Sequence, residues 1–302
     1  LSLCRLRKEK EMFEPKGVLT ALITPMHSDE SINTEELSRQ VERQIGAGVH
    51  GLFCLGTNGE FYSLTREEKL IITEVVVKQT AGRFPIIAGV GSITTRETID
   101  LAKKIAKMGV EALSVIVPYY VGLSQEQIYR HYRKVAEAVD VPVMIYNIPM
   151  RTGNNIEPET VQRLSQITNI IGIKDSSGKI EKIKRLIEIT GDDFAVLVGT
   201  DSLILQTLLE GGNGAVSGCA NLFPELMAGI YDSWKAGEME KAKQLQEKIA
   251  PFRATFKMGN PNSIVKRAMN LMGYPVGPVR EPANFEEPEI DKALIAVLAE
   301  YS

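Results

Sequence analysis

The sequence has few of the residues on which disulfide frameworks and metal sites depend. Its 302 residues include three cysteines and three histidines, and no cysteine belongs to a Cys-x-x-Cys pair. An odd number of cysteines without that spacing predicts neither a disulfide framework nor a zinc site. The histidines are scattered singly, without grouped carboxylates, so we expect no metal. This cysteine usage is typical of the reducing cytoplasm.

Two further absences limit the possible partners. The formal net charge is −3 and the pI is near 5.8, so no basic surface for nucleic acid or an acidic membrane is expected. No apolar run reaches the roughly 18 to 20 residues needed to cross a bilayer. Residues 1–11 lack the apolar core of a secretory signal. We therefore expect them to be an N-terminal extension upstream of a natural start at Met12.

Eight short apolar segments alternate with amphipathic helical segments, at about the spacing of a βαβ unit. This alternation predicts a parallel sheet, and eight strands close a TIM-type (β/α)8 barrel, here over residues 12–234. A doubly wound open sheet is less favoured because no GxGxxG motif follows the first strand. Residues 235–302 contain only helical segments and form a small C-terminal helical appendage. The predicted strands are 18–23, 50–55, 85–90, 112–117, 141–146, 170–174, 194–198 and 214–217.

The sixth of these strands ends in Lys174. Burial disfavours an ammonium group, so a lysine in this position either extends its amine to the surface or loses its proton and becomes a nucleophile. The fold favours the second alternative, because polar residues follow several other strands and a barrel brings all these strand ends to one face. The residues concerned are Thr57, Asn58, Tyr119, Tyr120, Tyr146, Arg151, Lys174, Gly199, Thr200 and Asp201.

A neutral lysine at this face would form an imine with a ketone and act as an electron sink for C–C chemistry. An ordinary lysine is neutral in only about one molecule in two thousand at pH 7, so its pKa must be lowered. Tyr146, Thr57 and Tyr120 supply hydroxyls for the proton transfers. The backbone of residues 56–59 and the side chains of Thr57 and Asn58 could hold a carboxylate.

Each of these residues also has a simpler interpretation. Tyr146 could cap the core with a solvated hydroxyl, and Arg151 could form a surface ion pair or bind a second carboxylate. Asp201 could bind a hydroxyl of a sugar-like substrate or cap a helix. Residues 211–217 (GGNGAVS) resemble a barrel phosphate site, which keeps open a protein that binds a phosphorylated ligand without imine chemistry.

Several motifs together resemble one family. Their order and spacing are similar to those of the dihydrodipicolinate synthase / N-acetylneuraminate lyase family of pyruvate-dependent class I aldolases, from about Phe13 to the end of the chain. The motifs are GTNGE (56–60), PYY (118–120), YNIPMRTG (146–153), GIKD (172–175), GGNGAVS (211–217) and NPNSIVK (260–266).

The resemblance implies a role for each matching residue. Lys174 would form the imine with pyruvate, with no other cofactor, and Tyr146 would be the acid/base. Thr57 and Tyr120 would complete the proton relay, with Tyr120 reaching the site of a neighbouring subunit in a homotetramer built as a dimer of dimers. Arg151 matches the arginine that holds the carboxylate of aspartate semialdehyde. Gly56 belongs to the pyruvate loop, and Gly199 and Val216 match positions that present backbone near the lysine.

Two departures from the family pattern bear on the substrate. The synthases usually have Thr-Thr in the pyruvate loop, and here the second residue is Asn58. Ile93, Phe61 and Lys69 replace polar residues of the lysine-feedback site, so we predict no inhibition by lysine. These departures suggest an unregulated synthase or an aldolase that cleaves a 2-keto-3-deoxy sugar acid. The presence of Arg151 favours the synthase and an acceptor aldehyde with an anionic group.

Overall fold

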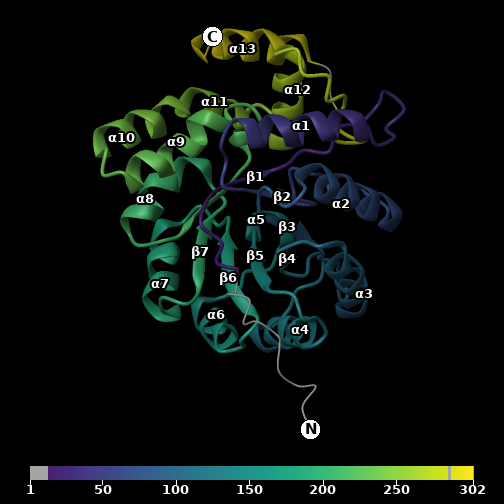
Figure 1. Cartoon of the computed structure of the whole chain (residues 1–302), viewed down its shortest axis with the longest axis vertical. Helices are drawn as coiled ribbons and strands as arrows, with labels where there is room; N and C mark the ends of the chain where they lie inside the picture. The colour runs from purple at the N-terminus through teal and green to yellow at the C-terminus, as the bar shows by residue number, and fades with distance from the viewer. Residues whose placement is uncertain (1–12, 285–286, 302) are drawn as a thin grey trace.

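Eight parallel strands form a closed barrel in the order β1 to β8 (Figure 1). The structure is a computed structural model, and it describes residues 13–284 and 287–301. The predicted barrel is therefore confirmed, and the open sheet is wrong. The strands are β1 (Gly17–Ala21), β2 (Gly51–Cys54), β3 (Ile86–Gly89), β4 (Ala112–Ile116), β5 (Val143–Asn147), β6 (Ile170–Asp175), β7 (Ala195–Val198) and β8 (Gly214–Ser217).

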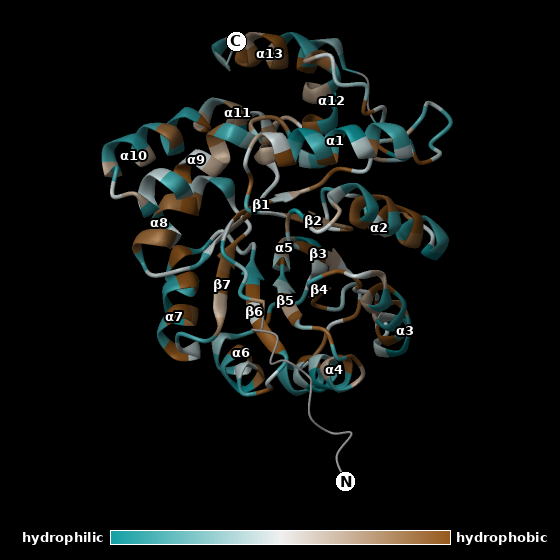
Figure 2. Cartoon of the chain, in the orientation of Figure 1, coloured by the Kyte–Doolittle hydropathy of each residue, from teal (hydrophilic) through white to brown (hydrophobic). Residues whose placement is uncertain are grey.

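Helices surround the barrel and carry both hydrophobic and hydrophilic residues (Figure 2). None of those in the described part of the chain is long and apolar enough to cross a membrane. The α-helices are α1 (Thr34–Gly46), α2 (Arg66–Thr80), α3 (Thr95–Ile105), α4 (Gln125–Glu137), α5 (Pro149–Thr152), α6 (Pro158–Ser165), α7 (Ile180–Thr190), α8 (Ile204–Leu209), α9 (Pro224–Lys235), α10 (Met239–Lys248), α11 (Ala250–Ala254), α12 (Pro261–Leu271) and α13 (Pro288–Leu298).

Polar residues at the helix starts explain where several of these helices begin. Thr65 and Ser124 form complete capping boxes with the residues three positions later, and the side chains of Asn33 and Thr94 accept a hydrogen bond from the backbone of the third helical residue. These bonds satisfy backbone N–H groups that have no partner within the helix. Each cap therefore fixes where the loop after the preceding strand ends and the next helix begins.

Two hydrophobic layers hold the barrel together. A small inner cluster fills the barrel and contains Leu19, Ala21, Phe53, Ile87, Ala112, Met144, Ile171, Leu197 and Val216. A larger cluster fills the space between strands and helices. Strand residues alternate between these two layers, as the period of two in a β-strand requires.

The C-terminal part consists of helices, as predicted, and it packs on the barrel rather than away from it. Helix α10 contacts α9, and α12 and α13 contact each other near α1 at the top of the view in Figure 1. The predicted boundary at residue 234 falls next to the end of α9 at Lys235. That division stays a prediction, and the predicted extension over residues 1–11 lies outside the described residues.

Candidate active site

Lys174 and Tyr146 are neighbours across two adjacent strands. Tyr146 of β5 and Lys174 of β6 are register partners, and both side chains are buried, with 4% and 3% of their surface exposed. The Nζ of Lys174 lies 4.2 Å from the centre of the Tyr146 ring and 4.6 Å from the centre of the Phe53 ring. The predicted pairing of these two residues at the barrel mouth is therefore present in the structure.

The surroundings of Lys174 lower its pKa. Burial lowers the pKa of this ammonium to about 7, and the negative charge of Asp201 opposes the shift. Among the described residues, no acceptor forms a hydrogen bond with the Nζ of Lys174. The aromatic rings attract a cation but replace little of the hydration that the ammonium loses. Burial therefore favours the neutral, nucleophilic form of the amine at this position.

The hydroxyl of Tyr146 is paired with that of Thr57. The two oxygen atoms lie 3.0 Å apart. Burial raises the pKa of Tyr146, while hydrogen bonds with Thr57 and Ser176 and the positive charge of Arg151 oppose this shift. Tyr146 is thus a protonated phenol next to the amine, with a second hydroxyl in position to exchange a proton with it. The alternative in which its hydroxyl is merely solvated does not fit this buried pair.

The glycines of the site leave space that other residues could not. A side chain at Gly199 would place its Cβ 1.9 Å from the Oγ of Ser176 and 3.0 Å from the Cε of Lys174. A side chain at Gly56 would place its Cβ 2.8 Å from the Phe53 ring. Backbone therefore lies close to the lysine at Gly199, one of the two predicted positions, whereas Gly56 lies against the Phe53 ring.

The other predicted pyruvate-binding residues lie close to the ends of β2 and β8. The Nδ2 of Asn58 would lie 2.7 Å from a Cβ at Gly218, so the Asn58 side chain lies against the backbone just after β8. Val216 is buried in the inner cluster of the barrel. The structure brings Asn58 and Val216 toward the same mouth, and their contact with a ligand stays a prediction.

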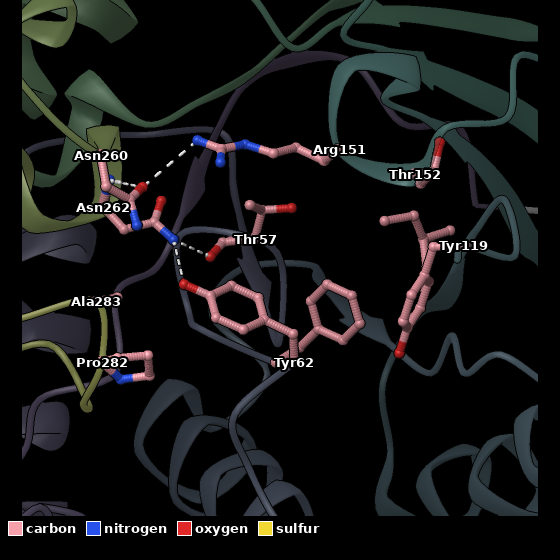
Figure 3. Close-up of a pocket in the computed structure, with 11 residues that line it drawn as sticks. Thr57, Tyr62, Tyr119, Arg151, Thr152, Asn260, Asn262, Pro282 and Ala283 are labelled. Atoms are coloured by element: carbon pink, nitrogen blue, oxygen red, sulfur yellow. Dashed lines mark hydrogen bonds between the residues drawn. The ribbon is translucent and has the colours of Figure 1, made fainter. Parts of the chain in front are cut away.

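A cavity of about 340 Å³ opens at the mouth next to Thr57. Arg151 lines it from the short helix α5, which the sequence did not predict, and donates a long hydrogen bond of 3.5 Å to the Oδ1 of Asn260 (Figure 3). Arg151 is exposed and has no carboxylate partner among the described residues. The surface ion pair considered for Arg151 is therefore absent from the described residues, and its guanidinium lines a largely apolar cavity.

Residues far along the chain complete this cavity, and sequence reasoning did not identify them as site residues. Asn260 and Asn262 come from the start of α12, and Pro282 and Ala283 from the loop that follows it (Figure 3). Tyr62 lines the cavity from the loop after β2. The motif at residues 260–266 was the available signal, because it belongs to the family pattern although it lies outside the predicted barrel.

Tyr120 does not join this cluster within the same chain. Its side chain is 90% exposed, and its backbone has a φ of +77°, which is uncommon for a residue with a side chain. Its neighbour Tyr119 does line the cavity. The predicted role of Tyr120 in the site of another subunit is compatible with this exposure and stays a prediction.

Asp201 is occupied by contacts inside the protein. It is 3% exposed, accepts a hydrogen bond of 2.6 Å from the Oγ of Ser217, and lies 3.5 Å from a guanidinium nitrogen of Arg253. The residue before it forms no side-chain cap, and Asp201 itself caps no helix. The capping interpretation is wrong, and nothing in the geometry supports hydroxyl binding, because Asp201 does not line the cavity.

The glycine-rich segment at residues 211–213 lies at the opposite end of the barrel. It precedes β8, whereas the mouth is formed by residues that follow the strands. The backbone N–H groups of Gly211, Gly212 and Asn213 already donate to carbonyls of Leu208, Thr207 and Val196. The backbone donors of residues 211–213 are therefore already paired, and phosphate binding by residues 211–217 stays a prediction.

The remaining expectations concern regulation and metals. The Nζ of Lys69 lies 5.7 Å from the centre of the Phe61 ring, and the side chain of Ile93 is exposed. The absence of inhibition stays a prediction. No group of three or more metal-ligating side chains occurs in residues 13–284 and 287–301. Cys54 and Cys219 are buried free thiols.

A barrel with a buried, readily deprotonated lysine beside a tyrosine is the architecture of an imine-forming aldolase. The model of the dihydrodipicolinate synthetase family matches residues 14–300. The chain belongs to this family of aldolase-type lyases, and the predicted resemblance is confirmed.

Individual relatives agree with this assignment. The 4-hydroxy-tetrahydrodipicolinate synthase of Methanopyrus kandleri is 42% identical over 273 residues, which cover 89% of this chain and 91% of that protein. A chloride-inhibited dihydrodipicolinate synthase from Acinetobacter baumannii, solved with pyruvate, is 33% identical with a TM-score of 0.92 and covers 94% of this chain and 98% of that one. A monomeric dihydrodipicolinate synthase variant is 31% identical with a TM-score of 0.91, covering 94% and 96%.

Proposed function

We propose that the protein is a pyruvate-dependent 4-hydroxy-tetrahydrodipicolinate synthase that joins pyruvate to aspartate semialdehyde. The buried Lys174 amine, with its pKa near 7 and Tyr146 beside it, is the observation that carries this proposal. The name of the relative from Methanopyrus kandleri supports the same reaction. The electron sink is the covalent imine itself, so the reaction needs no separate cofactor.

The reaction begins when the neutral Nζ of Lys174 attacks the ketone carbon of pyruvate. Water leaves and a protonated imine forms, with the proton supplied by the phenol of Tyr146 and the positive charge on the lysine nitrogen. The tyrosinate then takes a proton from the pyruvate methyl group, which gives an enamine whose carbon attacks the aldehyde carbon. Tyr146 protonates the oxygen that forms there, and Thr57 connects Tyr146 to the cavity in which the acceptor is bound. The amino group of aspartate semialdehyde attacks the imine carbon and displaces Lys174, and the proton it loses returns to Tyr146.

Arg151 makes the enzyme selective for the acceptor aldehyde. Its exposed guanidinium lines the cavity and is free to form a bidentate pair with a carboxylate of the aldehyde. The second candidate from the same family is a 2-keto-3-deoxy sugar acid aldolase. A polar acceptor with hydroxyls would instead use the amide of Asn260, which lines the same cavity.

Borohydride trapping tests the imine directly. Incubation with pyruvate and borohydride should add one reduced pyruvate per chain, mapped to Lys174 by peptide mass. Lys266, which is also buried, serves as an internal control and should carry no adduct. An unmodified mass, or a Lys174→Ala protein that is still labelled, would contradict the proposed chemistry.

A substrate panel distinguishes the two candidate reactions. With pyruvate held constant, aspartate semialdehyde should react with a kcat/KM at least about tenfold above those of glyceraldehyde, glycolaldehyde and glyoxylate. A preference for glyceraldehyde would support the sugar acid aldolase instead.

We also propose a cytoplasmic homotetramer in which Tyr120 completes the relay of a neighbouring subunit. Its 90% exposure leaves the side chain available for that contact. Mixing the separately impaired variants Tyr120→Phe and Thr57→Val should raise the activity above that of either variant, because some sites would then combine an intact Tyr120 with an intact Thr57. If mixed oligomers recover no activity, Tyr120 does not act in the site of a neighbouring subunit.

A further inference from the structure

The loop that carries Thr57 is held by the C-terminal part of the chain, which the fold does not require for a closed barrel. The Nδ2 of Asn262 donates to the carbonyl oxygen of Thr57 at 2.7 Å and to the hydroxyl of Tyr62 at 3.1 Å (Figure 3). Asn262 is 3% exposed and is 205 residues away from Thr57 in sequence. A single amide group thus fixes the backbone of Thr57 and one wall of the cavity.

The far end of the same loop is fixed by a buried ion pair. Glu60, which is fully buried, lies 3.0 Å from the Nζ of Lys266 in α12, and its second carboxylate oxygen accepts from the backbone N–H of Arg280 at 3.0 Å. The backbone of Glu60 has a φ of +54°, which a residue with a side chain rarely adopts. Contacts from outside the loop therefore hold it in a conformation that it would not favour alone.

The position of the Thr57 carbonyl matters because the hydroxyl of the same residue bonds to Tyr146. Within the loop, that carbonyl also accepts from the N–H of Glu60 at 3.0 Å, which closes a turn but does not fix the turn relative to the barrel. Asn262 supplies the connection to α12. A displacement of about 1 Å at a reacting group can reduce a rate by up to about a hundredfold.

We infer that Asn262 is a positioning residue that keeps the hydroxyl of Thr57 within hydrogen-bond distance of Tyr146, so that α12 is part of the active-site structure. This inference rests on the proposed function, because it presupposes that Thr57 and Tyr146 exchange a proton during imine chemistry. Asn262 touches the backbone of Thr57 and not the reacting atoms, so it acts through Thr57.

A double-mutant cycle between Asn262 and Thr57 tests the inference. Asn262→Leu should lower kcat by about 10- to 100-fold in the otherwise unchanged protein. In a Thr57→Val background, where the hydroxyl is already absent, the same substitution should cost less than about twofold. Asn262→Asp, which also lacks the amide donor, replaces Asn262→Leu if the latter does not fold.

Asn169→Leu is the matched control, because its amide likewise donates to two backbone carbonyls, those of Ala136 and Val139, beneath the barrel. It should change kcat by the same factor in both backgrounds. All variants are assayed well below their melting temperatures.

The outcomes separate the two proposals. A loss for Asn262→Leu that is at least about fivefold smaller in the Thr57→Val background supports positioning, and any smaller difference overturns it. Failure of the unsubstituted protein to form a borohydride-trapped pyruvate adduct overturns the proposed function instead.

Discussion

The protein buries one lysine in each of two regions, Lys174 at the end of β6 and Lys266 in α12, and their surroundings are opposite. Lys266 donates to Glu60 and to the carbonyls of Thr24 and Pro278. Lys174 has two aromatic rings and, in the described part of the chain, no hydrogen-bond acceptor. Burial lowers the pKa of both, but the charge of Glu60 opposes the shift at Lys266 by direct contact.

Burial alone therefore does not make a lysine reactive. The amine of Lys266 donates hydrogen bonds to three acceptors, and these bonds stabilise the contact between α12 and the loop after β2. Within residues 13–284 and 287–301, no hydrogen-bond acceptor replaces the water lost around Lys174, so burial destabilises its charged ammonium form. The difference lies in the partners and not in the degree of burial, which is 3% exposure for Lys174 and 1% for Lys266.

The largest expected effect is the loss of catalysis when the reactive lysine is replaced. Lys174→Met should lower kcat/KM by about a thousandfold or more, because no other amine can form the imine. The same protein should be at least as stable as the original, since methionine has no charge to desolvate. Steady-state kinetics and urea unfolding measure the two effects. A marked loss of stability would show that Lys174 also has a structural role.

The pH dependence of stability should reveal the shifted pKa of Lys174. Because the pKa is about 7 in the folded protein and 10.5 ordinarily, the unfolded chain binds the extra proton between these values. Stability relative to Lys174→Met should therefore rise from pH 7 to pH 10, by up to about 4 kcal/mol, and change little below pH 7. Urea unfolding of both proteins at several pH values measures this difference. A flat difference across that range would exclude a lowered pKa.

Replacing the second buried lysine should affect folding first. Lys266→Met leaves Glu60 buried without its partner and should reduce the free energy of unfolding by about 3–5 kcal/mol. The double variant Glu60→Gln/Lys266→Met should recover much of this loss, because no unpaired charge remains. Thermal and urea unfolding provide the measurement. If the double variant is as unstable as the single one, the carbonyl contacts of Lys266 matter more than the ion pair.

A smaller and more selective effect is expected at Arg151. Arg151→Ala should lower kcat/KM for aspartate semialdehyde by about 10- to 100-fold and leave the KM for pyruvate nearly unchanged, because only the acceptor carries the carboxylate that Arg151 binds. Arg130→Ala is a control with a comparably exposed side chain on α4, paired with Glu126, and should alter neither value. Equal losses for both substrates would make Arg151 structural.

The smallest expected effect is a change in the pKa of Lys174 when the nearby charge of Asp201 is removed. Asp201 raises the pKa of Lys174, and Arg253 lies next to Asp201. Asp201→Asn removes the negative charge, so the pH profile of imine formation should move to lower pH. The rate of borohydride-trapped labelling as a function of pH measures the shift. A profile that moves to higher pH would contradict this electrostatic role.

Local patterns predicted the barrel and the half of the site that lies on neighbouring strands. Because consecutive strands of a barrel are adjacent, the residues that end β5 and β6 had to lie side by side, and Tyr146 and Lys174 do. The phosphate interpretation of residues 211–217 used a glycine-rich pattern whose first three residues precede β8, and a segment that precedes a strand lies at the end opposite the mouth. The partners of Asp201 could not be predicted from the local sequence, because Ser217 and Arg253 belong to other elements.

The amino-acid sequence by itself determined the eight-stranded order, the position of Lys174 at a strand end and the family. These follow from hydrophobic period, capping residues and motif spacing, which are local properties of the chain. Only the tertiary structure decided which buried lysine is reactive and what holds the Thr57 loop. Both depend on contacts between residues more than 200 positions apart, as for Glu60 with Lys266 and Thr57 with Asn262, and no local pattern encodes the acceptors that a buried amine will meet.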